Sequence, residues 1–300
     1  MVDISRATSG VSLPTELSQQ IWQSAQEQSV VMRLAPRMPL PGAGTTINVI
    51  TGDPEPEWTS ETGPKSVKRP GLDNKVLRGY TLAVIVPFSN QFRRDLSVLY
   101  GAIVDRLPGA LAKKFDQTVF FGTAPGSDFD TLANAPAVSI NNVEGGQTAY
   151  DGFVAALASV SVSGDDLTGW ALSPQGEVMA LGAKDGNDRP LFIDNVQTQG
   201  SVGSVLGRPA FRSRAAYQAG TPGAPGTPET LGFGGDWSYA VWGQVEDIQI
   251  SVSDQATLTD GENTINLWEQ NMFAVRAEFE VGFRVRDVNA FARLTGAIPS

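Results

Sequence analysis

The sequence predicts a mixed α+β fold with a large share of extended and irregular backbone, and three observations carry this prediction. The 32 glycines and 19 prolines exceed what compact helical bundles tolerate. Few stretches repeat apolar residues at the helical spacing of three or four. Residues 240–250 and 271–286 instead alternate apolar with charged side chains, as half-buried strands do. With 300 residues, of which 41% are hydrophobic, the chain can bury one large core or two modest ones.

The composition also limits the chemistry that the protein can perform. The absence of histidine and cysteine excludes Ser-His-Asp and Cys-His nucleophilic sites, disulfides, and zinc sites built on imidazole or thiolate. We therefore expect a protein that is not an enzyme and holds no cofactor or metal. The net charge of -10 opposes generic nucleic-acid binding through phosphate neutralisation. Residues 1–10 lack a secretory pattern and no stretch has the apolar length of a membrane span, so we expect a soluble intracellular protein.

The N-terminal region is expected to be a flexible arm followed by a helix. Residues 1–12 are polar and unpatterned. Apolar residues then fall near helical spacing from Pro14 to Val30, and Pro14 suits a first helical turn. Three prolines between Pro36 and Gly44 remove backbone donors and fix φ, so the chain must run extended there.

A long two-stranded excursion with a polar tip is predicted next. Residues 45–50 and 76–86 are rich in β-forming side chains, while Asp53 to Lys75 carries few large apolar ones, with acids on the first limb and bases on the second. Such a hairpin has little core of its own, so we expect it to lie across a neighbour, anchored by a tryptophan. The alternative is a solvated loop whose charges keep it soluble. The residues assigned to this subunit interface are Glu55, Glu57, Trp58, Glu61, Lys65, Lys68 and Arg69.

Two helices are predicted in the middle of the chain. Apolar residues from Leu96 to Val119 draw one stripe along a helix that ends near Gly122. Pro108 is expected to kink or interrupt it, at a cost on the order of 3 kcal/mol. The second helix, roughly Gln147 to Ser159, carries on one face Tyr150, Phe153, Val154 and Leu157.

The remaining chain is expected to form short elements and then two long strands. Residues 170–172, 177–181 and 191–192 are apolar pieces separated by turns, and 208–217 predicts a strand. Gly220 to Gly235 is a Pro/Gly-rich stretch, which predicts a loop with almost nothing to bury. The wetter face of the last strand, or a subunit contact, is expected at Ala274, Arg276, Glu278, Glu280, Arg284 and Arg286.

Several segments, taken in order, carry a resemblance to a known family. They are Val84–Ser89, Lys113–Thr123, Leu172–Pro174, Met179–Gly186, Arg189–Leu191, Leu206–Ala210, Phe233–Ser238, Asn271–Arg276, Phe283–Val285 and Asn289–Phe291. From Pro14 to Gly296 the chain resembles the major capsid proteins of tailed phages with the Hong Kong 97-type fold. In that family an arm leads to an extended loop, a spine helix in a peripheral domain, an axial domain, and strands that return to the peripheral domain.

The resemblance implies a Hong Kong 97-like arrangement of regions and a function. The regions are an N-terminal arm and short helix at 1–44, an extended β-hairpin loop with its strands at 45–86, a peripheral domain with the long spine helix at 87–140, an axial domain at 141–255, and a return to the peripheral domain at 256–300. The implied function is that of a major capsid protein. It would self-assemble into the hexamers and pentamers of an icosahedral phage head that encloses double-stranded DNA without binding it specifically.

The resemblance also implies partners. The arm begins so close to Met1 that it leaves no room for a scaffolding segment, so a separate scaffolding protein and a portal are expected, with a decoration protein as a further candidate. Some relatives join a loop lysine covalently to an asparagine of a neighbour. Lys65 and Lys68 lie in the corresponding loop, but neither the asparagine nor the catalytic carboxylate can be assigned here.

Two alternatives remain open at this point. An encapsulin uses the same fold as a cellular compartment around a cargo enzyme, and a cargo-binding helix at the start of the chain would favour it over a virus. A carboxylate-based hydrolase is an alternative of another class. Its candidate residues, which have the sequence context of turns and surfaces, are Asp165, Asp166, Glu177 and Asp185.

Overall fold

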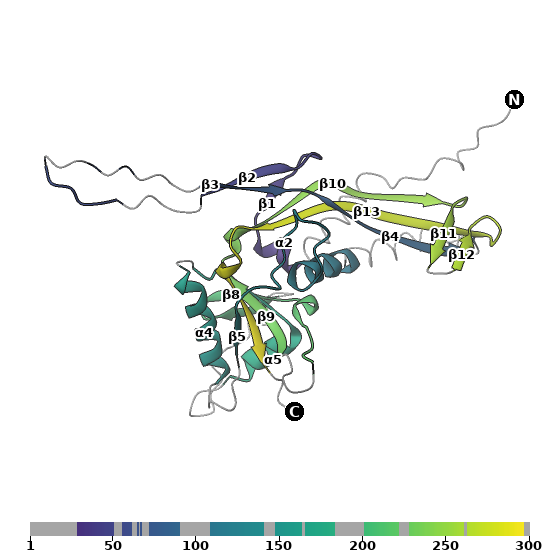
Figure 1. Ribbon diagram of the computed structural model, residues 1–300. Coiled ribbons are helices and arrows are strands. Elements are labelled where there is room, and N and C mark those ends of the chain that lie inside the picture. The colour runs from purple at the N-terminus through teal and green to yellow at the C-terminus, as the bar shows by residue number, and fades with distance from the viewer. Residues whose placement is uncertain are drawn as a thin grey trace.

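Two β-sheets organise the protein, and their arrangement confirms a mixed α+β fold. The computed structural model describes residues 29–50, 56–61, 65, 67, 72–90, 109–140, 148–163, 166–183, 201–221, 228–260 and 263–296. A four-stranded sheet, here called the long sheet, runs through an elongated upper part, and a six-stranded sheet lies in a compact lower part (Figure 1). The predicted arm and nearly all of the first predicted helix lie outside the described residues.

The long sheet has two central strands of 14 residues each, which confirms the two alternating stretches predicted near the end of the chain. These two strands pair antiparallel, the strand on one side is also antiparallel, and the short strand on the other side is parallel. In spatial order the strands are β1 (Arg37–Pro39), β10 (Ala240–Ser253), β13 (Met272–Val285) and β4 (Tyr80–Ser89). The hairpin of β11 (Thr257–Asp260) and β12 (Asn263–Asn266) lies at the far end of this sheet.

The alternation along β13 separates a buried face from a wetter one, as the sequence predicts. Val275 and Phe279 are buried, whereas Arg276 and Glu278 are more exposed, and Glu280 and Arg284 continue the wetter face. Arg286 lies just beyond the strand and is exposed. The prediction was wrong for Ala274, which is buried between Ser253 of β10 and Pro87 of β4.

The six-stranded sheet is mixed and carries two helices, α4 (Ala149–Val162) and α5 (Pro174–Leu181). In spatial order its strands are β5 (Ala137–Ser139), β14 (Phe291–Gly296), β9 (Glu229–Gly235), β6 (Gly169–Leu172), β8 (Arg208–Arg212) and β7 (Ser201–Val205). The strand predicted at 208–217 therefore ends early. Ser213 stops it, because its hydroxyl accepts a hydrogen bond from Ala215 N–H and starts a 3-10 turn.

The central strand β9 corrects the prediction of a loop from Gly220 to Gly235. This seven-residue strand lies between β6 and β14 and pairs with each of them over part of its length, and Leu231 and Phe233 are completely buried. The glycines of this strand serve close packing. A Cβ on Gly234 would lie 2.4 Å from the ring of Trp170, and one on Gly235 would lie 2.4 Å from the ring of Phe291.

The helix α4 is present where the sequence predicts a helix, but its buried face differs from the predicted one. Phe153 is completely buried and Leu157 is partly buried, whereas Tyr150 and Val154 are more than a third exposed. The helix approaches β5 through Gly152, where a Cβ would lie 2.3 Å from the Cα of Ile140. The face of the helix toward the sheet therefore combines the small Gly152 with the Phe153 ring, which meets Trp170 of β6 edge to face.

Residues 109–120 form a helix that lies between the two sheets and ends before Gly122, as predicted. The earlier part of the predicted helix, with the kink expected at Pro108, falls outside the described residues. Phe120 stacks on Phe233 of β9 with ring centroids 4.9 Å apart, and Phe115 meets Phe283 of β13 edge to face. One hydrophobic core therefore joins the long sheet to the six-stranded sheet.

A buried carboxylate, Asp116, links this helix to two other segments. Its side chain accepts hydrogen bonds from the Ser29 hydroxyl at 2.6 Å and the Val30 N–H at 3.0 Å, at the start of α2 (Val30–Leu34). It also accepts one from the Ser213 hydroxyl at 3.1 Å, next to the six-stranded sheet. Burial raises the pKa of Asp116 to about 6, although the hydrogen bonds act in the opposite direction.

Candidate subunit interface

A two-stranded hairpin projects from the molecule at the end of the long sheet opposite to β11 and β12 (Figure 1). Its strands are β2 (Thr45–Ile50) and β3 (Leu72–Leu77), which pair antiparallel along their whole length. The two-stranded excursion predicted from the sequence is therefore present. Its second strand begins at Leu72 and is separate from β4, whereas the sequence predicted one continuous stretch at 76–86.

The base of the hairpin is fixed to the long sheet by Leu77, which is completely buried. Gly243 of β10 faces Gly282 of β13, and the two leave a space above the sheet. A Cβ on either glycine would lie 2.9 or 3.1 Å from the side chain of Leu77. The leucine therefore fills this space, and the hairpin leaves the sheet in a defined direction.

Arg284 holds the same base by hydrogen bonds. Its guanidinium donates to the carboxylate of Asp130 at 2.8 Å and to the carbonyl of Val76 at 2.8 Å, and it lies 3.3 Å from Asp128. The Tyr80 hydroxyl in turn accepts a hydrogen bond from Asp128 N–H at 3.1 Å. Only 12% of the Arg284 side chain is exposed, so these charge-assisted hydrogen bonds are shielded from water.

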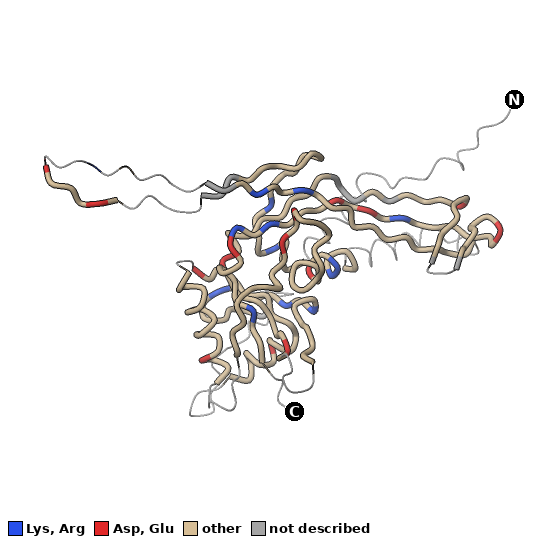
Figure 2. Tube along the Cα trace, in the orientation of Figure 1, with Lys and Arg blue, Asp and Glu red and all other residues tan. Residues whose placement is uncertain are grey.

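The described part of the loop beyond the hairpin is exposed at every position. Residues 56–61 lie beyond the ends of β2 and β3, away from both sheets (Figure 1). Trp58 is fully exposed, and Glu57 and Glu61 flank it in an acidic stretch. Figure 2 shows acidic residues on this stretch and Lys and Arg gathered around the base of the hairpin. A tryptophan with no covering in its own chain is a typical anchor for a protein interface.

The second limb of the loop is described at two positions only. Lys65 and Val67 are both exposed. Glu55, Lys68 and Arg69, the other residues assigned to the interface from the sequence, lie outside the described residues.

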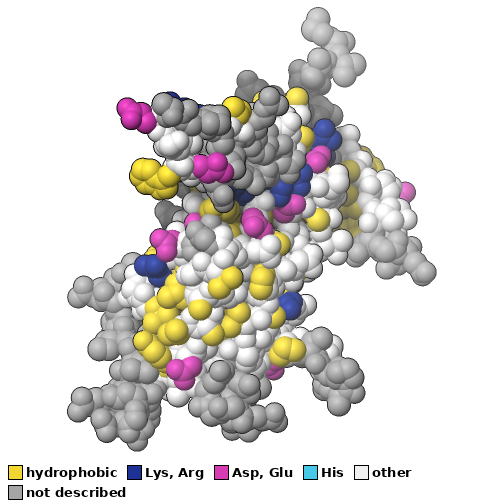
Figure 3. Space-filling view, turned by 60° about the vertical axis from the view of Figure 1, so that its left-hand side comes forward, with side chains coloured by type: hydrophobic (Ala, Val, Ile, Leu, Met, Phe, Trp, Pro, Cys, Tyr) yellow, Lys and Arg dark blue, Asp and Glu magenta, His cyan; other side chains and the backbone are white. Residues whose placement is uncertain are grey.

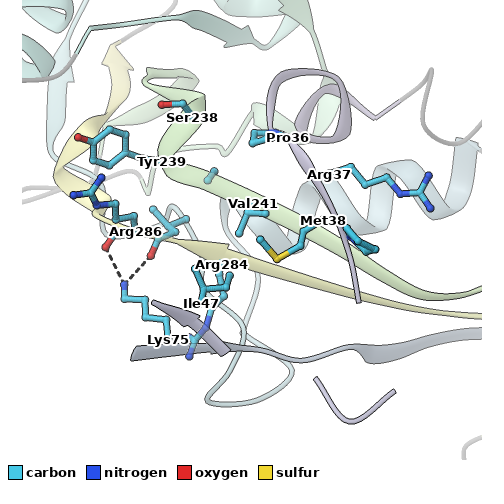
Figure 4. A pocket seen from close by; sticks show the side chains of 13 residues that line it. Pro36, Arg37, Met38, Ile47, Lys75, Ser238, Tyr239, Val241, Arg284 and Arg286 are labelled. Carbon is cyan, nitrogen blue, oxygen red and sulfur yellow. Dashed lines mark hydrogen bonds between the residues drawn. The ribbon is translucent and has the colours of Figure 1, made fainter. Parts of the chain in front are cut away.

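A groove of about 580 Å³ lies at the base of the hairpin, and we call it the base groove (Figure 4). Sequence reasoning missed it, because its walls come from five stretches that are separated along the chain. In Figure 4 the side chains of Met38 and Val241 lie side by side, and Lys75 reaches across to the end of β13. The lining residues are Pro36, Arg37, Met38, Pro39, Ile47, Lys75, Ser238, Tyr239, Ala240, Val241, Arg284, Val285 and Arg286.

Arg284 of the base groove pairs with the two carboxylates described above, and the other three cations contact neutral oxygens or aromatic rings. Lys75 Nζ donates to the carbonyls of Val285 and Arg286 at 2.7 and 3.0 Å. The guanidinium of Arg286 lies 4.8 Å from the ring centroid of Tyr239. Arg37 donates to the side-chain oxygen of Gln244 at 3.1 Å and lies over a tryptophan ring of β10.

Two further apolar surfaces are exposed. On β4, an edge strand of the long sheet, Val84, Ile85 and Val86 are each more than a third exposed. Long apolar edge strands attract other chains unless something covers them. Hydrophobic side chains also gather on the lower part of the molecule (Figure 3), where α4 and α5 expose Tyr150, Val154, Val162, Val178 and Leu181.

Of the four residues that a carboxylate-based hydrolase would need, the structure describes two. Glu177 pairs with Arg212 at 3.3 Å, and Asp166 is exposed. Asp165 and Asp185 lie outside the described residues. Within the described ranges no group of acidic residues could hold a metal ion. No described helix has the length and apolar character needed to cross a membrane.

Comparisons with known proteins give a consistent answer. A model described as the phage capsid family matches residues 9–296. The chain is 30% identical to the "Probable major capsid protein gp17" of Mycobacterium phage D29 over 298 residues, covering 95% of this chain and 90% of that protein. It is 22% identical to the "Major capsid protein" of Staphylococcus phage 80alpha, covering 95% of this chain and 85% of that protein. A solved structure from Mycobacterium phage Ogopogo has a similar fold, with a TM-score of 0.72, 20% identity, and coverage of 90% of this chain and 92% of that chain.

Proposed function

The chain belongs to the phage capsid family, and we propose that its copies build the phage head through contacts made by the projecting loop. It is a major capsid protein, a structural component of the virion rather than an enzyme. The family match along residues 9–296 carries this conclusion. The relatives named above are phage capsid proteins, and no observation favours the encapsulin alternative.

The proposed assembly is an icosahedral head of hexamers and pentamers that encloses double-stranded DNA. The net charge of -10 supports a shell that encloses the genome without binding it tightly, because the subunits and the DNA are both negatively charged. Electron microscopy of the purified chain, produced alone or with the other head proteins, should show closed shells. A chain that stays monomeric under all these conditions contradicts the proposal.

The proposed regions follow the Hong Kong 97-like arrangement. We assign the arm and short helix to 1–44, the extended loop to 45–86, the peripheral domain to 87–140, and the axial domain to 141–255. The axial region holds four strands of the six-stranded sheet, β6 to β9, and its last strand, β10, belongs to the long sheet. The last region, 256–300, contributes β13 to the long sheet and β14 to the six-stranded sheet, so its strands serve both parts. A separate scaffolding protein, a portal and a decoration protein are the proposed partners.

The loop is the proposed subunit interface, with Trp58 at its centre. Because Trp58 is fully exposed in the single subunit, Trp58→Ala should leave subunit stability unchanged. In an assembled shell the same change should remove a buried contact, and such truncations typically cost about 2 kcal/mol or more. Shell yield after gradient sedimentation should therefore fall. Thr59→Ala, at the neighbouring exposed position, serves as the control.

The basic limb can be tested separately. Reversing Lys68 and Arg69 to Glu should impair shell assembly while the subunit stays folded. A normal particle yield from this double variant would refute a role of the basic limb in the interface.

A further inference from the structure

We propose that a cationic surface at the junction of the two sheets contacts the phosphate backbone of the enclosed DNA. We call this surface the waist patch, and its members are Arg33, Lys113, Lys114 and Arg214. The inference rests on the proposed function and deepens it, because it names the surface of the subunit that meets the genome. Three observations carry it: the convergence of three segments, the lack of acids along them, and the exposure of their cations.

The three segments that form the waist patch are joined by the buried carboxylate of Asp116. The Ser29 hydroxyl, at the N-cap of α2, donates to this carboxylate at 2.6 Å. The Ser213 hydroxyl, at the N-cap of the 3-10 turn 214–216, donates to it at 3.1 Å. Each segment carries an exposed cation within about one helical turn of its contact with this carboxylate. These cations are Lys113 on the helix at 109–120, Arg33 on α2 and Arg214 on the 3-10 turn. Figure 2 shows Lys and Arg on segments at this junction of the upper and lower parts.

The three segments are rich in cations and poor in acids, although the whole chain has a net charge of -10. The ranges that contain Lys or Arg but no Asp or Glu are 28–52, 106–115 and 195–228. Of the ion pairs within the described part of the chain, one involves these ranges, between Arg212 and Glu177. Positive charge is therefore concentrated at the junction of a subunit that is negative overall.

The side chains of the waist patch are placed to contact an external anion. All four are exposed, and none of them takes part in an ion pair within the described residues. The guanidinium of Arg33 lies 4.5 Å from the ring centroid of Phe211, and this stacking holds the cation at the surface while its N–H groups can still donate. Lys113 and Lys114 lie on the exposed face of their helix. Arginine and lysine side chains of this kind are the usual donors to DNA phosphates.

The negative net charge does not prevent such a contact at short range. At physiological ionic strength, exposed charges separated by more than about 8 Å are largely screened, so a phosphate at the waist patch interacts mainly with the cations beside it. Phosphate contacts also release the counterions of DNA, which favours binding whatever the base sequence. One subunit offers few such contacts, whereas the many copies of a shell act together. The waist patch therefore steadies the DNA without recognising its sequence.

Salt-dependent binding of unassembled subunits to a fluorescent DNA duplex of about 20 base pairs tests the waist patch. The patch variant combines Lys113→Gln, Lys114→Gln and Arg214→Gln, and it keeps Arg33 because that side chain packs on Phe211. The control variant combines Lys65→Gln, Arg78→Gln and Arg276→Gln, which removes the same charge from exposed positions of the loop and the long sheet.

The slope of log affinity against log salt concentration reports the number of phosphate contacts, at about 0.9 for each. The slope should therefore become shallower by about 2 to 3 in the patch variant and stay unchanged in the control variant. Equal slopes in the two variants, or a wild type that does not bind the duplex at low salt, overturn the proposal.

Assembled particles give a second test, because formaldehyde links lysine amines to the bases of DNA that lies in contact. After digestion, Lys113 and Lys114 should carry nucleotide adducts in DNA-filled particles and none in empty ones, and Lys65 should carry none in either. Filled particles without adducts at Lys113 and Lys114 overturn the DNA contact and leave the shell function intact.

The patch variant also separates a DNA contact from a protein contact. It should form closed shells in the same yield as the wild type. A folded patch variant that fails to form shells assigns the waist patch to a contact between proteins and overturns the proposal. Absence of shells from the wild type contradicts the proposed function itself, and this proposal with it.

Discussion

Replacing Asp116 by asparagine should remove a pH dependence that this buried carboxylate gives to subunit stability. The pKa of Asp116 is raised from its ordinary value of 3.8 to about 6, mainly by burial, because its side chain is only 1% exposed. The folded subunit therefore holds a proton that the unfolded chain releases. The contribution of Asp116 is fully present below its unfolded pKa and is lost as the pH rises through its folded pKa. The difference between the two pKa values corresponds to about 3 kcal/mol.

The assay is urea unfolding of unassembled subunits between pH 4 and pH 7, followed by the fluorescence of the buried tryptophans. Asparagine has nearly the same shape as aspartate and can still accept the hydrogen bond of the Val30 N–H, but it does not ionise. The free energy of unfolding of the variant, relative to the wild type, should rise by about 2 to 3 kcal/mol across this range. A difference that stays flat, or falls as the pH rises, would refute the reasoning.

Three further changes test the packing. Gly176→Ala places a Cβ 2.3 Å from a carbonyl oxygen of β9, so it should lower the free energy of unfolding by about 2 kcal/mol, measured by urea titration; an unchanged midpoint would contradict this. Arg284→Lys cannot keep the hydrogen bonds to both Asp130 and β3, so hydrogen exchange at β3 should accelerate while exchange at β11 stays the same; equal rates would argue against the base as a rigid support. Phe233→Ala should cost about 3 to 5 kcal/mol, whereas Val178→Ala, at an exposed position, should cost almost nothing, and similar losses would contradict the assigned core.

The sequence predicted the long, strongly periodic elements correctly. β10 and β13 were predicted from the alternation of apolar and charged residues, because a long strand with one solvent-exposed face requires this alternation along its length. The projecting hairpin and its exposed tryptophan followed from charge and from the lack of apolar side chains. Alternation, charge and the lack of apolar side chains are properties of a single segment, so they can be recognised without knowledge of the rest of the fold.

The missed features depend on contacts between distant segments. The glycines of β9 led to the prediction of a loop. A strand forms there because the rings of Trp170 and Phe291 pack directly against the backbone of Gly234 and Gly235, and both rings come from distant parts of the chain. Ser173 and Pro174 were interpreted as a turn. An N-cap serine followed by a proline at the first helical position also starts a helix, and here it starts α5. The base groove has no local signature at all, since its walls come from β1, the hairpin, β10 and β13.

The order of the strands has a consequence for synthesis on the ribosome. β4 pairs with β13, and β5 pairs with β14, so each of these early strands finds its described partner only when the last quarter of the chain has been translated. A fragment released before residue 272 lacks β13 and β14, so each of the two large sheets is missing an interior strand. We therefore expect truncated translation products to be left out of particles, because they cannot complete either sheet.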